Sequence, residues 1–267
     1  MSRLEVSARL KVRAGQLEGF KRQAAESIRR TEEKHTRILR YDWFLSKDET
    51  ECEVSETYPD PAALVEHHAN LGDATATLYA YFAEGHQVTL YGDPPAEFVA
   101  RVEAARGGKI SWYSFLQGLQ SEPDSSQTPG ARVKSIFEVG AHMTVRPGQL
   151  EEWKTQAAEL MRLTREMDTQ TLRYDWFLSQ DGTQCGVREA YLTEAGLIEH
   201  NAHIMEARAK LFRDFADDHV MTVYSEASQQ LIQLMDVHAG GARWFSFLQG
   251  LEPSPTDSTD DRAMVAL

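Results

Sequence analysis

The stretch LRYDWFLS occupies residues 39–46 and returns unchanged at residues 172–179. Upstream of it, RAGQLEGFKRQAAE at 13–26 returns as RPGQLEEWKTQAAE at 146–159. Repeats of solenoid proteins are short and numerous, whereas here the sequence holds two long copies. The repeat therefore predicts a tandem duplication of one domain.

The duplication divides the chain into four parts. We expect the first copy at residues 1–119 and the second at 133–251. Residues 120–132 between them are rich in Ser, Pro, Gly and Gln, which predicts a flexible linker. Residues 252–267 are acidic and show no periodicity, which predicts a disordered tail.

The composition limits the classes of partner. The chain has 267 residues, of which 42% are hydrophobic, and a formal net charge of −13. With 41 acidic and 28 basic residues it lacks the excess of Lys and Arg that nucleic acids or anionic membranes attract. No apolar run is long enough to span a bilayer. Two cysteines and no secretory pattern predict a cytoplasmic protein.

Hydrophobic periodicity gives the elements of one copy. The predicted order is a strand at 4–12, a helix at 17–28, a strand at 39–46, a turn at 47–50, a strand at 52–58, a helix at 60–82, a strand at 86–90, a short helix near 98–102 and a strand at 112–116. The order β-α-β-β-α-β is typical of the split βαβ, ferredoxin-like fold. Each copy should therefore form a sheet covered on one face by helices.

The stretch at 39–46 also predicts how the two copies meet. Tyr41, Trp43 and Leu45 share one face of that strand, and Phe44 lies on the other. A sheet that is apolar on both faces must be covered on both. We therefore expect an α+β fold in which two ferredoxin-like domains pack apolar face to apolar face. One chain would then form both halves of a dimeric α/β-barrel.

The motif LRYDWFLS-turn-C-x-V-x-E-x-Y, with a downstream His at 67 or 200, resembles the antibiotic biosynthesis monooxygenase (ABM) family, which includes quinol monooxygenases. The resemblance covers nearly the whole chain in two copies. It implies a dimeric barrel, formed here within one chain as a pseudo-dimer, and leaves a further homodimer open. It also implies oxidation of a small phenolic or quinol-type aromatic by O₂ without a cofactor. Relatives of this fold bind haem or lack known chemistry, so fold alone constrains function loosely.

Glu56 and Glu189 are the candidate catalytic carboxylates. Each shares a strand face with Cys, Val and Tyr side chains, so it points where its neighbours are buried. Burial would raise the pKa of the carboxyl group or demand a partner. Two interpretations stay open: a functional carboxylate, or a structural one bound by Arg40 or Arg173 or by a helix N-terminus.

His67 and His200 are the candidate catalytic bases. Each lies on the apolar face of the long helix and should face the sheet. An imidazole there can take the proton of a phenol and so raise its electron density for reaction with O₂. It can equally be a core histidine bonded to Glu56 or Glu189, and an oriented base needs such a partner.

Further residues are expected to line the substrate cavity. His86 and His219 begin the fourth strand of each copy on its apolar face, where strand ends flank pockets. The aromatic candidates are Tyr41, Trp43 and Tyr58 in the first copy and Tyr174, Trp176 and Tyr191 in the second. Their alternative role is core packing.

Metal and nucleotide chemistry have little support in the sequence. His200 and His203 have a spacing suited to a metal, but the first copy has Asn70 in place of the second histidine. Cys52 and Cys185 are expected to be buried hydrophobes. We expect no metal and no cofactor. A haem- or metal-binding barrel and a non-catalytic binding protein are the alternatives to a monooxygenase.

Overall fold

The computed structural model describes residues 3–34, 36–106, 110–119, 136–238 and 241–251. The linker expected at 120–132 and the tail expected at 252–267 lie outside the described residues. None of the described helices combines the length and the apolar character that crossing a bilayer requires.

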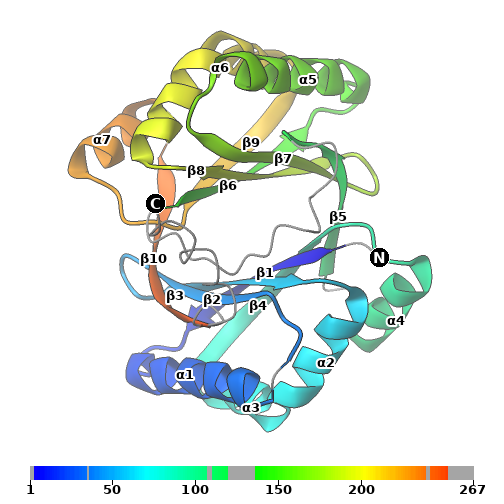
Figure 1. Cartoon of the computed structure of the whole chain (residues 1–267), viewed down its shortest axis with the longest axis vertical. Helices are drawn as coiled ribbons and strands as arrows, with labels where there is room; N and C mark the ends of the chain where they lie inside the picture. The colour runs from blue at the N-terminus through cyan, green and yellow to red at the C-terminus, as the bar shows by residue number, and fades with distance from the viewer. Residues whose placement is uncertain (1–2, 35, 107–109, 120–135, 239–240, 252–267) are drawn as a thin grey trace, which may run out of the picture.

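Ten strands form one closed barrel, in the order β1-β3-β2-β10-β9-β6-β8-β7-β5-β4 (Figure 1). The first half supplies β1 (Leu4–Val12), β2 (Arg40–Ser46), β3 (Glu51–Tyr58), β4 (Ala83–Tyr91) and β5 (Ile110–Gln117). The second half supplies β6 (Phe137–Val145), β7 (Thr171–Ser179), β8 (Gln184–Tyr191), β9 (Ala216–Val223) and β10 (Ala242–Gly250). The predicted α+β fold class, two ferredoxin-like halves packed as one barrel, is confirmed.

The helices lie outside the barrel, in one layer on each half (Figure 1). They are α1 (Leu17–Glu33), α2 (Pro61–Leu71), α3 (Asp73–Thr77), the π-helical turn η1 (Leu78–Phe82), α4 (Ala96–Arg106), α5 (Leu150–Met167), α6 (Glu194–Asp214) and α7 (Gln229–His238). The long helix expected at 60–82 is interrupted at Gly72, whose φ of 48° favours glycine. In the second half, α6 continues through the equivalent position.

The last strand of each half crosses to the other half. β5 pairs in parallel with β4 of its own half and antiparallel with β7 of the second half. β10 likewise pairs with β9 and with β2. The sequence predicted that the sheets meet face to face, and the structure adds that two strands join their edges. Because every strand has two neighbours, the barrel has no open sheet edge.

The outer face of the barrel packs against the helices and forms one hydrophobic core in each half. Trp43 on β2 is 2% exposed and meets Phe20 of α1 edge to face, with ring centroids 5.9 Å apart. In the second half Trp176 on β7 is 1% exposed and meets Trp153 of α5 at 5.6 Å. The repeated aromatic pair therefore fixes the first helix of each half against its sheet.

The inner face of the barrel is only partly apolar, because it carries ion pairs beside two buried aromatic clusters, Phe44, Tyr224 and Phe245 in one and Tyr91, Tyr113 and Phe177 in the other. Arg40 donates two hydrogen bonds to Glu138 of the other half, at 2.8 and 2.6 Å. Arg173 makes the equivalent pair with Glu5, at 3.0 and 2.9 Å. The alternation of a strand places Arg40 on the face opposite Tyr41. These four charges are tolerated in the interior because each is paired with a charge of the other half.

The pair formed by Glu5 predicts how stability depends on pH. Burial alone would raise the pKa of Glu5, but Arg173, Arg3 and Arg188 outweigh it and lower the pKa to about 2 from 4.5. The stabilisation is therefore present above about pH 4.5 and is lost as the pH falls towards about 2. At about 1.4 kcal/mol per pKa unit, Glu5→Gln should cost roughly 3 kcal/mol at pH 7 and about half of that at pH 3.

Urea denaturation at the two pH values measures this difference. Glu18→Gln is the control, because the side chain of Glu18 is 76% exposed. It should change the free energy of unfolding little at either pH. An equal cost of Glu5→Gln at pH 7 and pH 3 would contradict the assignment.

Candidate active site

Each half holds a pocket between the outer face of its sheet and the covering helices. The empty volume is about 740 Å³ in the first half and about 370 Å³ in the second, in both cases partly open to solvent. Both pockets are candidate substrate sites because apolar and aromatic side chains line them together with a few polar groups, and they differ in size.

Most of the predicted site residues line these pockets. The first pocket is lined by Tyr41, Trp43, Glu56 and His86, and the second by Tyr174, Trp176, Glu189, His200 and His219. His67, Tyr58 and Tyr191 do not line a pocket, although each contacts a residue that does. The structure thus brings the predicted residues together in two equivalent places.

Each candidate carboxylate is bound by a tyrosine. The hydroxyl of Tyr58 donates to Oε2 of Glu56 at 2.6 Å, and Tyr191 donates to Glu189 at the same distance. Neither Arg40 nor the arginine equivalent to it is the partner, because those side chains lie on the inner face of the barrel. Burial raises the pKa of Glu189, although the nearby His200 and Tyr191 act to lower it. Its carboxyl group therefore holds a proton more readily than an exposed glutamate does.

The ring of His67 is enclosed by aromatic side chains. Its residue is 0% exposed, and its centroid lies 4.7 Å from that of Tyr41 and 5.8 Å from that of Tyr58. No described residue forms a hydrogen bond with either ring nitrogen, so the expected bond to Glu56 is not found among them. Burial, with a contribution from His68, lowers the pKa of His67 to about 3. His67 is therefore a neutral imidazole at physiological pH.

His200 is held differently, by an aspartate that no sequence pattern pointed to. Nδ1 of His200 lies 2.7 Å from Oδ2 of Asp168, which ends α5, and the side chains are 2% and 1% exposed. The hydroxyl of Thr171 donates to the same oxygen at 2.7 Å. Nε2 of His200 is buried and has no hydrogen-bond partner among the described residues. A carboxylate on Nδ1 favours the tautomer that leaves Nε2 able to accept a proton.

The pair His200 and His203, whose spacing suits a metal, shares this aspartate. Nδ1 of His203 lies 2.7 Å from Oδ1 of Asp168, so each oxygen of the carboxylate has its own histidine. His203 is also closer to solvent, with a side chain that is 25% exposed. Among the described residues, no group of three or more His, Cys, Asp or Glu side chains is placed to hold a metal ion.

The second pocket also contains a cation that the first one lacks. Arg208 of α6 lines it and donates a hydrogen bond to Oδ1 of Asn201, another lining residue. Burial, with Arg208, lowers the pKa of His219 in this pocket to about 4. The repeat aligns Arg208 with Thr75, which lines the first pocket. The second pocket therefore contains a long guanidinium side chain where the first contains a threonine.

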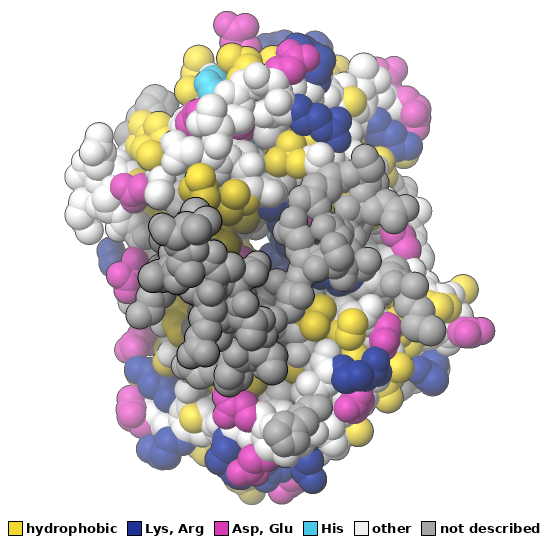
Figure 2. Space-filling view, in the orientation of Figure 1, with side chains coloured by type: hydrophobic (Ala, Val, Ile, Leu, Met, Phe, Trp, Pro, Cys, Tyr) yellow, Lys and Arg dark blue, Asp and Glu magenta, His cyan; other side chains and the backbone are white. Residues whose placement is uncertain are grey.

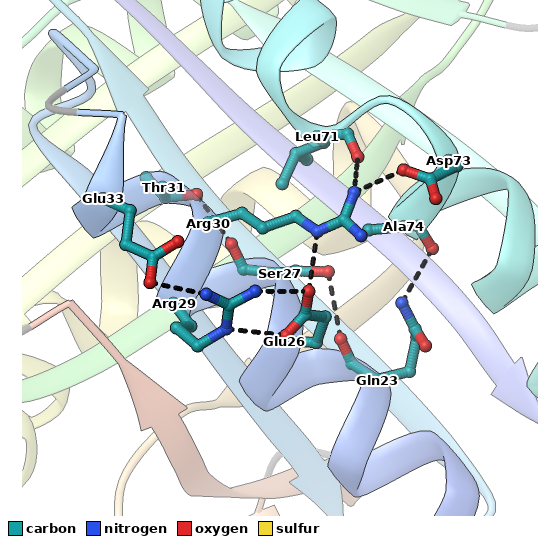
Figure 3. A network of polar contacts seen from close by, with 10 residues as sticks. All are labelled: Gln23, Glu26, Ser27, Arg29, Arg30, Thr31, Glu33, Leu71, Asp73 and Ala74. Atoms are coloured by element: carbon teal, nitrogen blue, oxygen red, sulfur yellow. Dashed lines mark hydrogen bonds and ion pairs between the residues drawn. The ribbon is translucent and has the colours of Figure 1, made fainter.

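A network of hydrogen bonds fixes the covering helices of the first pocket (Figure 3). Arg30 of α1 donates to the carbonyl of Leu71 at 3.2 Å and to the carboxylate of Asp73, on either side of the helix break. Gln23 of the same helix donates to the carbonyl of Ala74 at 3.0 Å. The interruption of the long helix is therefore anchored to α1, and it shapes the wall of the larger pocket.

Sequence reasoning missed three residues of these sites. His68, which lines the first pocket, follows the predicted His67 directly, and only the turn of the helix decides which of the two faces the cavity. Asp168 and Arg208 have no counterpart of the same type in the first copy, so the repeat gave no signal for them. Asp168 aligns with His35, which lies outside the described residues.

Comparison with known proteins gives the fold a context. Two similar solved structures are both named "putative monooxygenase". The one from Fusobacterium nucleatum subsp. nucleatum is 11% identical, covers 94% of this chain and 94% of its own, and has a TM-score of 0.60. The one from Lactobacillus acidophilus NCFM is 10% identical, covers 83% of this chain and 92% of its own, and has a TM-score of 0.51.

Comparisons of sequence give no further assignment. No family model matches the sequence, and no curated protein matches it. At identities this low, the likeness concerns the fold. The match to the first neighbour covers 94% of each chain and so includes both halves of the barrel. The chain thus has the fold of proteins that are named as monooxygenases.

Proposed function

We propose that the chain is a cofactor-independent monooxygenase that oxidises a small phenolic or quinol-type aromatic with O₂. The observation that carries the proposal is the Asp168–His200 pair at the second pocket, where a buried imidazole is oriented through Nδ1 and keeps Nε2 unpartnered among the described residues. The fold shared with proteins named as monooxygenases supports the same reaction class.

The proposed reaction draws all its electrons from the substrate. With naphthalene-1,4-diol as the example, the diol and O₂ give 2-hydroxy-1,4-naphthoquinone and water. One oxygen atom enters a ring C–H bond as a hydroxyl group, and the other leaves as water with the two hydrogens of the oxidised diol. No external reductant is needed, because the aromatic ring reduces O₂ itself.

The chain's own residues have three roles in this proposal. His200 takes the phenolic proton on Nε2, and Asp168 stabilises the imidazolium that forms. The phenolate that remains is favoured by the positive charge of Arg208 in the same pocket. Tyr174 and Trp176 provide flat apolar walls for the ring. A deprotonated phenol is more electron-rich and gives up an electron to O₂ more easily.

The first pocket is proposed to bind an aromatic molecule of the same class. Glu56 and His86 line it as polar groups, and Tyr41 and Trp43 as aromatic ones. His67 and Glu56 remain the proposed catalytic pair of this half, acting through Tyr41 or Tyr58 because His67 does not itself line the cavity. Tyr58, Tyr191 and His219 remain proposed substrate-binding residues.

The organisation of the chain is part of the proposal. We propose that residues 1–119 and 133–251 are duplicated ABM-like domains joined by a linker at 120–132, and that one chain acts as a pseudo-dimer in the cytoplasm. The paired arginines that cross between the halves support this, because each has its equivalent in the other copy.

Incubation with ¹⁸O₂ and naphthalene-1,4-diol tests the function by mass spectrometry. We expect enzyme-dependent formation of the hydroxynaphthoquinone with one ¹⁸O atom. Spontaneous oxidation gives naphthoquinone without the label, and heat-denatured protein measures that background. Absence of enzyme-dependent label with a panel of phenols and quinols would overturn the proposal. A rise in melting temperature without turnover would then favour a binding protein, and a Soret band on haemin titration a haem protein.

A further inference from the structure

Two histidines of the second half share one buried carboxylate. Nδ1 of His200 lies 2.7 Å from Oδ2 of Asp168, and Nδ1 of His203 lies 2.7 Å from Oδ1 of the same side chain. The side chain of Asp168 is 1% exposed, and the hydroxyl of Thr171 adds a hydrogen bond to Oδ2 at 2.7 Å. Of the two histidines, His200 lines the second pocket and His203 does not, so the proposed reaction leaves His203 without a role.

Asp168 carries a negative charge in this buried place. Burial alone would raise the pKa of its carboxyl group, but the hydrogen bonds from His200, Thr171 and His203 outweigh burial and lower the pKa. A buried carboxylate needs a compensating positive charge. Among the described residues, no Lys or Arg side chain forms an ion pair with Asp168, so the two imidazoles are left to supply that charge.

The two imidazoles differ in their access to water. The side chain of His203 is 25% exposed, whereas that of His200 is 2% exposed. Figure 2 shows a histidine side chain at the surface over α6, the helix that carries both residues. Because water stabilises an ionised group, an imidazolium costs less at His203 than at His200. The positive charge that compensates Asp168 therefore belongs on His203.

The base at the pocket needs the opposite state. An imidazole can accept a phenolic proton only while it is neutral. A carboxylate beside an imidazole favours its charged form, so Asp168 alone would load His200 with a proton before any substrate arrived. One carboxylate stabilises two imidazolium groups poorly, because the two positive charges repel each other. A charged His203 thus keeps His200 neutral.

The first half contains the equivalent histidine without these partners. His67 forms no hydrogen bond with a described residue, and burial is the main reason why its pKa is lowered to about 3. Asn70 stands at the position that matches His203. A buried imidazole without a carboxylate is a weak base, and one with an unshared carboxylate is charged too early. The pair of Asp168 and His203 places His200 between these limits.

We propose that His203 is a positioning residue that holds the positive charge beside Asp168 and so keeps His200 unprotonated for the substrate. The inference rests on the proposed function, because it gives His203 a role in that reaction. When His200 takes the phenolic proton, His203 releases its own proton to water, and the carboxylate then stabilises the new imidazolium. His203 recovers a proton from water when His200 passes its proton to the reduced oxygen.

Other ionisable groups surround the three side chains and are common to the proteins compared below. They are Tyr174 of β7, Glu189 and Tyr191 of β8, and Glu199, Glu206 and Arg208 of α6. Arg208 lies in the second pocket, and Glu199 binds Thr169, so neither forms a hydrogen bond or an ion pair with Asp168. Because these groups stay the same, a difference between the variants reports the charge at position 203.

The pH dependence of kcat/KM for ¹⁸O incorporation tests the role of His203. In His203→Asn, which introduces the residue of the matched position in the first half, the amide can still donate to Asp168 but carries no charge. We expect the acid limb of the profile to move up by about one pH unit or more, the effect of an unshared opposite charge. His203→Lys keeps a positive charge and should leave the limb at or below the position of the parent protein.

Lys210→Gln is the control for the loss of a cation from α6. Lys210 pairs with Asp214 at 2.9 Å and is 46% exposed, so its removal should leave the acid limb unchanged. A loss of rate in His203→Asn that is equal at every pH, with no movement of the limb, would show a structural role only and would overturn the inference.

NMR titration of the ¹⁵N-labelled imidazoles tests the same charge without any substrate. His200→Gln identifies the signals of His200 by their loss. At pH 7 we expect a neutral ring at His200 and a charged ring at His203. In His203→Asn the ring of His200 should take up its proton at a pH about one unit higher or more.

The NMR result separates this inference from the proposed function. A titration of His200 that is the same in the parent and His203→Asn proteins would overturn the inference, whether or not ¹⁸O is incorporated. A shifted titration in a protein that oxidises no phenol would support the arrangement of charge and overturn the monooxygenase reaction instead.

Discussion

Replacing His200 with glutamine should lower the rate of ¹⁸O incorporation by about 10²- to 10⁴-fold, the range that a positioned general base contributes. Glutamine keeps a polar side chain of similar length but cannot take the phenolic proton. The Michaelis constant should change little, since Tyr174 and Trp176 still bind the ring. Single-turnover measurement of the phenolate absorbance, together with product analysis, separates the rate of the chemical step from the binding of the substrate.

Two companion variants assign the effect to the base. Asp168→Asn removes the charge that holds Nδ1 of His200 at 2.7 Å and should lower the rate while preserving substrate affinity. Glu199→Gln is the control on the same helix, because Glu199 binds Thr169 and not the pair. Turnover that survives in His200→Gln but is lost in His67→Gln would move the chemistry to the first half.

Replacing Trp176 with alanine should lower the free energy of unfolding by about 3–5 kcal/mol, the cost of deleting a large buried aromatic side chain. Trp176 is 1% exposed and contacts Trp153 and Tyr174 edge to face at 5.6 and 5.4 Å. Its removal leaves a cavity between β7 and α5 that the sheet is too constrained to close. Urea denaturation followed by circular dichroism measures the loss.

Leu172→Ala on the same strand is the matched control for Trp176→Ala. Leu172 is 43% exposed, so its truncation should change the free energy of unfolding by about 0.5 kcal/mol or less. The difference between the two variants gives the cost of losing the buried indole, corrected for any effect that alanine itself has in β7. A loss below about 1 kcal/mol for Trp176→Ala would contradict the placement of this side chain in the core.

The fold was largely predictable because the repeat and the period of two are both local signals. The copies of LRYDWFLS located equivalent strands, and the elements around them gave the ferredoxin-like order. The charge on the inner face of the barrel was also visible in principle, since Arg40 and Asp42 alternate with Tyr41 and Trp43 in that very stretch. The crossing of β5 and β10 was not predictable, because nothing local says which sheet edge a final strand joins.

The candidate site was predictable only in part. Glu189 and His200 follow from strand and helix faces, which are set by residues close in sequence. Asp168 caps the end of α5, and His200 lies near the start of α6. Only the packing of α5 on α6 brings the two side chains together. Comparing the two copies could not reveal such a contact, because the equivalent residue is His35. The differences between the copies, rather than their identities, distinguish the two pockets.

The crossing of β10 has a consequence for the newly made chain. β2 is synthesised early, but its partner along one edge is β10, the last strand among the described residues. At roughly 5–20 residues per second, ribosomes leave that edge without its partner for about ten seconds or more. During this time an unpaired strand can join a strand of another nascent chain. Slowing translation between the two copies should therefore increase aggregation, whereas binding of a chaperone to the first half should reduce it.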